Sequence, residues 1–124
     1  MSKRARIFVC GQDEIENGQY RCVNVLYSGE PSSVLLFRLN DRYYAYRNLC
    51  VHMPRTLDCE ADTVFDDAGA HLRCSMHGIT YDPVSGEALS PICEGRKLSP
   101  VKFLQESDGI WLYDKRVAPV QSAH

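Results

Sequence analysis

The sequence has no long apolar run and no export signal. A membrane-spanning helix needs about 18 consecutive apolar residues, and no such run occurs in this 124-residue chain. The opening residues lead into a strand-like segment without an apolar signal core, and Ala5 separates Arg4 from Arg6, so a twin-arginine signal is absent. We therefore expect a cytoplasmic protein that has no membrane partner.

An excess of charge of one sign is also missing. The 14 Lys and Arg residues are nearly balanced by 16 Asp and Glu residues, which gives a formal net charge of −2 and a pI near 6.0. A nucleic-acid-binding domain would carry a basic surface, so we expect no nucleic-acid partner. The length suits one domain with a modest core and is too short for two.

Long helical periodicity is lacking too, and short strand-like runs take its place. Asn40-Asp41 and Asp108-Gly109 each predict a tight hairpin turn between two such runs. We therefore expect an all-β fold, a small antiparallel sandwich or barrel. The runs rich in β-branched and aromatic residues are 5–10, 20–26, 33–39, 42–47, 101–106 and 110–113.

Cysteine and histidine occur in two short mixed pairs, Cys50-Val-His52 and Cys74-Ser-Met-His77, separated by 21 residues. Thiolates suit iron-sulfur clusters or zinc, and imidazole suits iron, zinc and copper, which leaves iron and zinc as candidates. A zinc finger typically pairs Cys with Cys and His with His. Because each pair here is mixed, two facing loops can each give one ligand to each iron of a [2Fe-2S] centre. We favour that centre over structural zinc and over a fortuitous set of core cysteines and surface histidines.

The stretch from Asn48 to Gly86, with its run Cys-Ser-Met-His-Gly-Ile-Thr-Tyr-Asp-Pro-Val-Ser-Gly, closely resembles the cluster-binding subdomain of Rieske proteins. The resemblance implies one [2Fe-2S] cluster per chain. Two cysteines would bind the buried iron and two histidines the outer iron. These ligands are Cys50, Cys74, His52 and His77.

The resemblance also implies which residues tune the cluster. Hydrogen bonds to its sulfurs stabilise the reduced form, and high-potential respiratory members have a serine donor where Ile79 stands. Tyr81 matches the family's aromatic residue near the cluster, and its hydroxyl is expected to bond a cysteine sulfur; the alternative is a core aromatic with a solvated hydroxyl. Gly78 is expected to adopt positive φ or let the backbone approach the cluster. We therefore favour a low-potential ferredoxin over a quinol-oxidising subunit.

The expected organisation is a single Rieske domain over residues 1–124. A turn at 66–69 predicts a hairpin that brings Cys74 back towards Cys50. We expect base strands roughly at 5–47 and 87–114, a cluster-binding insertion roughly at 48–86, and a frayed tail at 115–124.

The remaining cysteines have ordinary explanations. Cytosolic conditions argue against disulfides. Cys10 and Cys22 lie in strand patterns, where a thiol behaves as a small buried hydrophobe. Cys59 and Cys93 fall in segments that can approach the cluster, although packed thiols are the preferred interpretation. His71 lacks a paired cysteine and is expected on the surface.

The sequence therefore predicts a one-electron carrier that is not itself an enzyme. A catalytic mononuclear iron site would need two further histidines and a carboxylate, for which 124 residues leave no room. The resemblance implies transfer from an NAD(P)H-dependent reductase to a terminal oxygenase. The alternatives are a cluster-bearing small subunit or redox sensor of a larger enzyme, and a zinc-stabilised binding module.

Overall fold

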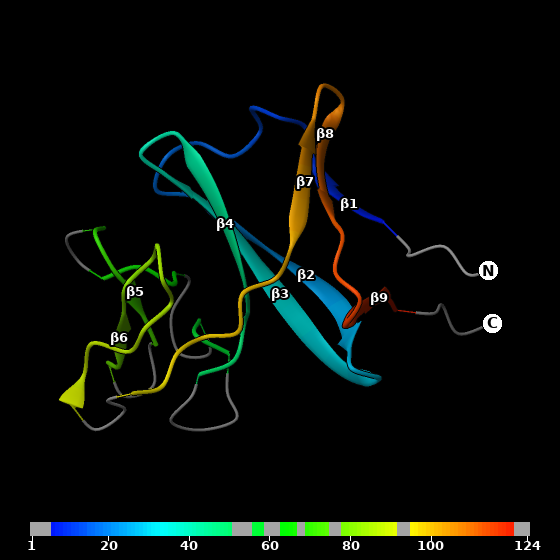
Figure 1. Cartoon of the computed structure of the whole chain (residues 1–124). Helices are drawn as coiled ribbons and strands as arrows, with labels where there is room; N and C mark the ends of the chain where they lie inside the picture. Colours follow the sequence, from blue (N-terminus) through cyan, green and yellow to red (C-terminus); the bar gives the residue numbers. More distant parts are fainter. Residues whose placement is uncertain are drawn as a thin grey trace. The chain divides into compact units, whose positions relative to one another are not determined.

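The computed structural model describes residues 6–50, 56–58, 63–66, 69–74, 78–91 and 95–120. The chain forms two compact units. Unit 1 consists of Met1–Ala45 and Val101–His124, and unit 2 is the stretch Tyr46–Pro100, which interrupts unit 1 in the sequence. Within the described ranges the strands are paired antiparallel and no α-helix occurs, which confirms the all-β prediction (Figure 1). The same residues contain no helix with the length and apolar character needed to cross a membrane.

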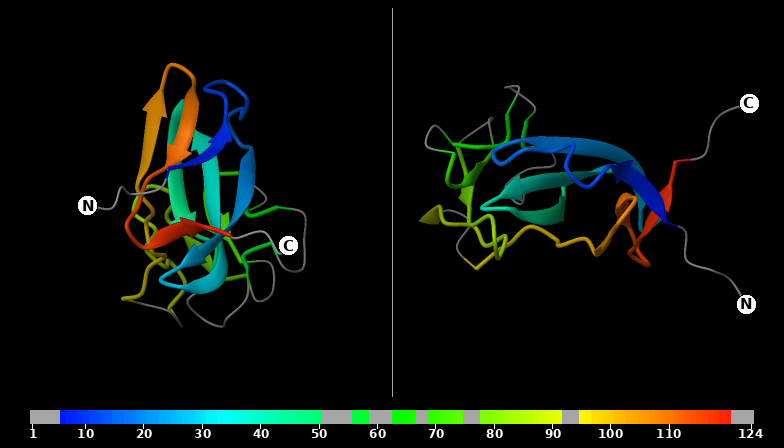
Figure 2. Two further views of the ribbon diagram at one scale, coloured as in Figure 1. Left: turned by 90° about the vertical axis from the view of Figure 1, so that its right-hand side faces the viewer. Right: turned by 90° about the horizontal axis from the view of Figure 1, so that it is seen from above.

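Unit 1 contains two antiparallel sheets, one of three strands in the order β1-β8-β7 and one of four in the order β4-β3-β2-β9 (Figures 1 and 2). Side chains from both sheets form one buried cluster, which is the arrangement expected of a small sandwich. The strands are β1 (Ile7–Cys10), β2 (Tyr20–Tyr27), β3 (Glu30–Leu39), β4 (Arg42–Arg47), β7 (Phe103–Glu106), β8 (Gly109–Leu112) and β9 (Val117–Pro119).

Alternation along the strands decides which side chains enter this core. In β2, Val23, Val25 and Tyr27 pack in or against the cluster because successive side chains point to opposite faces of a strand. Cys22 has the opposite parity and is exposed, so the prediction that it is buried was wrong. Cys10 is buried as predicted, and burial raises the pKa of its thiol.

Both predicted hairpins of unit 1 are present. Asn40 and Asp41 have φ values of 51° and 64° and join β3 to β4, as the two central residues of a tight hairpin turn require. In the β7–β8 hairpin Gly109 has φ 145° and begins β8. A Cβ at Gly109 would lie 2.5 Å from the carbonyl oxygen of Cys10, so only glycine fits this close approach.

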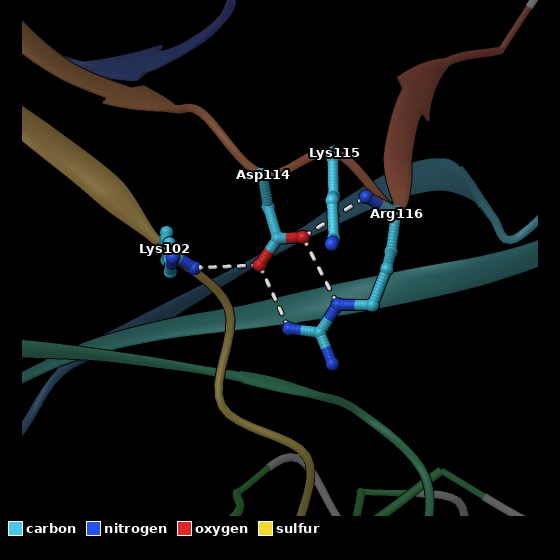
Figure 3. Close-up of a pocket in the computed structure, with 4 residues that line it drawn as sticks. All are labelled: Lys102, Asp114, Lys115 and Arg116. Atoms are coloured by element: carbon cyan, nitrogen blue, oxygen red, sulfur yellow. Dashed lines mark hydrogen bonds and ion pairs between the residues drawn. The ribbon is translucent and has the colours of Figure 1, made fainter.

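The segment after β8 differs from the predicted frayed tail. Val117–Pro119 forms β9 along β2, and the Ser28 amide donates to the Arg116 carbonyl at 2.7 Å. Asp114, whose side chain is 2% exposed, bonds Arg116, the residue that directly precedes this strand (Figure 3). Its carboxylate accepts bonds from the backbone amides of Lys102 and Arg116 and from the Arg116 guanidinium, at 2.8–3.0 Å. The prediction failed because this long-range anchor sets the strand.

Unit 2 is built on a small antiparallel ladder. Its two strands are β5 (Leu72–Arg73) and β6 (Thr80–Tyr81). The predicted hairpin before β5 is confirmed, since Phe65 bridges Leu72 and the Arg73 amide donates to the Val64 carbonyl at 2.7 Å.

Residues 87–100 also belong to unit 2, although the sequence analysis placed them with the base strands. Ala88 bridges Tyr81, and the Leu98 amide donates to the Gly86 carbonyl at 2.9 Å. This segment therefore completes the ladder that carries Cys74. The prediction failed because the pairing depends on isolated bridges, which leave no continuous strand pattern in the sequence.

Candidate metal centre

Cys50 follows the end of β4 and is held in place by Asn48. The Asn48 side chain is 2% exposed, and its Oδ1 accepts a hydrogen bond from the Leu57 amide at 2.9 Å. This bond joins the two ends of the segment that contains Cys50. Sequence reasoning missed the role of Asn48; the available signal was a polar residue between a strand and the first predicted cysteine ligand.

Cys74 follows β5 directly, and two backbone hydrogen bonds fix its position. Its amide donates to the Ile79 carbonyl, and the Gly78 amide donates to the Cys74 carbonyl, both at 2.8 Å. Gly78 has φ 71°, which confirms the expected positive φ and explains why glycine stands there. The loop that contains Cys74 is therefore an extension of the β5–β6 hairpin.

The two cysteines are buried and form no disulfide. Cys50 is 3% exposed and Cys74 is 1% exposed. The Tyr81 hydroxyl, on a side chain with no exposed area, lies 3.2 Å from the Cys50 sulfur. The expected contact between Tyr81 and a cysteine sulfur is thus present, and solvent does not reach the hydroxyl. Because a thiolate only accepts hydrogen bonds, Tyr81 is the donor whenever Cys50 is ionised.

Ile79 is buried and contributes no side-chain donor. Its carbonyl accepts the hydrogen bond of the Cys74 amide, so the hydrogen bond between residue 79 and the loop comes from the backbone. Among the described residues, the Tyr81 hydroxyl contacts a cysteine sulfur, at the position that the sequence suggested.

His71 lies apart from this arrangement, as expected. Its side chain is 46% exposed, and its Nδ1 lies 3.1 Å from Asp66 Oδ2. Burial alone would raise the pKa of Asp66, but hydrogen bonds from His71 and Ala70 lower it further than burial raises it. The histidine is thus occupied in a surface pair.

The described residues supply half of the predicted ligand set. Within their ranges no three potential metal ligands come together. The two buried thiols still fit a metal centre, since a buried thiolate needs a cation or donors to offset its lost hydration. The predicted ligands His52 and His77 and the cysteines Cys59 and Cys93 lie outside the described residues.

Comparison with known proteins gives one family. The sequence model described as the Rieske [2Fe-2S] domain matches residues 5–102. No curated protein matches the sequence.

Solved structures show the same fold. The ferredoxin of carbazole 1,9a-dioxygenase from Nocardioides aromaticivorans IC177 is 23% identical, covers 93% of this chain with 98% of its own, and has a TM-score of 0.66. A complex of reduced oxygenase and oxidized ferredoxin in carbazole 1,9a-dioxygenase contains a chain that is 20% identical. The match covers 92% of this chain and 97% of that chain, with a TM-score of 0.73. At these identities the likeness is one of fold.

Proposed function

Because the chain belongs to the Rieske [2Fe-2S] domain family, we propose that it holds one [2Fe-2S] cluster and acts as a one-electron carrier. Two thiolates bind one iron and two imidazoles bind the other, through Cys50, Cys74, His52 and His77. The observation that supports this most is the buried Cys50 thiol with the Tyr81 hydroxyl 3.2 Å from its sulfur.

The cluster supplies the one-electron chemistry, and the residues of the chain control its setting. Cys50 and Cys74 are buried, so little water reaches their sulfurs. Tyr81 donates a hydrogen bond whose strength grows as negative charge accumulates on the centre, and this favours the reduced state. The chain therefore stabilises a transferred electron without needing a substrate pocket.

Solved structures of similar fold support a proposal for the direction of transfer. Solved structures of similar fold include ferredoxin and oxygenase complexes of carbazole 1,9a-dioxygenase. We propose that this chain likewise delivers electrons to a terminal oxygenase, that an NAD(P)H-dependent reductase supplies them, and that the exchange takes place in the cytoplasm.

The first test is the content of the purified protein. Protein made with adequate iron should be red-brown and contain about two irons and two acid-labile sulfides per chain, because four ligands hold one binuclear centre. Titration with dithionite should show the uptake of one electron per chain. A colourless protein with one zinc would contradict the proposal and favour the zinc-stabilised module.

The second test concerns Tyr81. Tyr81→Phe should lower the reduction potential on the order of tens of millivolts, because it removes a hydrogen bond that is stronger to the reduced centre. Potentiometric titration measures the shift. Tyr46→Phe is the matched control: Tyr46 is also buried, at 3% exposure, but its hydroxyl donates to the carbonyls of Pro83 and Val84 at 2.8–2.9 Å. Equal shifts in both variants would show that the Tyr81 contact does not tune the centre.

A further inference from the structure

Arg73 stands immediately before Cys74 on β5. It pairs with Thr80 of β6 in the antiparallel ladder, and Leu72, on the other face of the strand, is fully buried. Alternation therefore directs the Arg73 side chain outward, and it is exposed. Its backbone position is set by β5, which is one of the two strands of the hairpin that carries the second ligand loop.

The guanidinium of Arg73 does not extend away from the protein. It lies over Gly78, where a Cβ would meet Nη2 at 3.3 Å and Nε at 3.5 Å. Glycine at this position thus leaves the space that the guanidinium occupies. Gly78 directly follows the predicted ligand His77, and its amide bonds the Cys74 carbonyl. The positive charge is therefore held beside both described ends of the ligand loop.

No carboxylate neutralises this charge within the described part of the chain. Other arginines there do have carboxylate partners, such as Arg38 with Asp41 and Arg116 with Asp114. Arg73 forms no such ion pair among the described residues. Among the described residues, the charge of Arg73 thus stands beside the loop without a carboxylate partner.

We propose that Arg73 raises the reduction potential of the cluster, as a fixed positive charge beside its second ligand loop. The inference rests on the proposed function. Two ferric ions, two sulfides and two thiolates sum to zero charge with neutral imidazoles, and one electron from an external reductant makes the centre −1. A nearby cation stabilises this added charge more than it stabilises the oxidised form. Because Arg73 is exposed, water and salt reduce the interaction without abolishing it.

The experiment compares three variants of the whole protein by potentiometric titration. Arg73→Gln removes the charge, Arg73→Lys keeps it, and Lys97→Gln removes an exposed charge of unit 2 that lies opposite Glu87 in the ladder. At the midpoint potential of the parent, Arg73→Gln should show about a threefold lower ratio of reduced to oxidised protein. At 59 mV per tenfold change this corresponds to a fall of about 28 mV.

Further outcomes separate charge from packing. Arg73→Lys should recover most of the parent ratio, Lys97→Gln should leave it unchanged, and the effect of Arg73→Gln should shrink between about 0.1 and 1 M salt as the Debye length falls from about 10 to 3 Å. An unchanged potential in a red-brown Arg73→Gln protein overturns this inference alone. Equal, salt-independent shifts in Gln and Lys variants overturn it in favour of a packing role. A parent without a cluster overturns both this inference and the proposed function.

Discussion

Replacing Asp114 by Ala is expected to lower the free energy of unfolding by about 3 kcal/mol. The variant leaves the backbone amides of Lys102 and Arg116 and the Arg116 guanidinium without their shared acceptor. Arg116 is 37% exposed, so water compensates part of the loss. The expected destabilisation therefore lies at the lower end of the range for a broken buried ion pair. Denaturant unfolding followed by far-ultraviolet circular dichroism measures the change.

The same carboxylate gives the protein a pH-dependent stability. The bond from Arg116, with the backbone amides, holds the pKa of Asp114 well below its ordinary value of 3.8. The folded protein therefore binds this proton less readily than the unfolded chain does, and the stabilisation is present above about pH 4. It decreases as the pH falls from there through the pKa of the folded carboxyl. Asp114→Asn should consequently approach the parent in stability only as the pH falls towards the pKa of the folded carboxyl.

Two controls identify the origin of the effect. Asp13→Asn removes an 88% exposed carboxylate whose pair with Arg38 spans 3.9 Å, and we expect about 0.5 kcal/mol or less. Hydrogen exchange of the Ser28 amide reports on β9, because this amide bonds the Arg116 carbonyl. An Asp114→Ala protein with parental stability and unchanged Ser28 exchange would show that the carboxylate does not anchor β9.

Replacing either predicted imidazole ligand should remove the cluster. His52→Ala and His77→Ala each withdraw one of two ligands from the same iron, and a half-ligated iron is released. We expect the visible absorption and the iron and sulfide contents to fall to a small fraction of the parental values. Because metal binding is coupled to folding of the ligand loops, proteolysis within residues 48–86 should become faster.

His71→Ala is the matched control for these variants. His71 bonds Asp66 on the surface, so its loss should leave the spectrum and metal content unchanged. Retention of the full spectrum in His77→Ala would contradict the ligand assignment. Loss of the spectrum in His71→Ala would show that the assay reports general destabilisation.

The strands of unit 1 could be predicted where local chemistry decides them. β4 has the predicted bounds, Arg42–Arg47, since Asn40 and Asp41 favour the turn before it and its tyrosines favour extended backbone. β9 could not be predicted, because three residues ending in Pro119 have no periodicity of their own. They pair with β2 just after the residues that Asp114 fixes through Lys102 and Arg116.

The candidate site shows the same division. The ligands were predicted from the spacing within each short pair and stay a prediction. The family resemblance predicted that Tyr81 contacts a cysteine sulfur, and the structure shows that this cysteine is Cys50. The packing of Arg73 over Gly78 could not be predicted, since it depends on the torsions of a long side chain and on a turn formed across the hairpin. Asn48 was missed for a similar reason, because its partner Leu57 is set by tertiary structure.

The two backbone bonds that close the loop at Cys74 have a consequence for the speed of electron exchange. An electron moves between two centres only when the atoms around both can reach a common arrangement, and large rearrangements slow the step. The Cys74 amide and carbonyl are tied to Ile79 and Gly78, so the backbone that carries the sulfur cannot shift without breaking these bonds. Polar groups fixed in advance need little reorganisation when charge arrives. The hairpin thus favours rapid electron exchange even when the two centres differ little in reduction potential. This suits a protein that must both accept and release an electron.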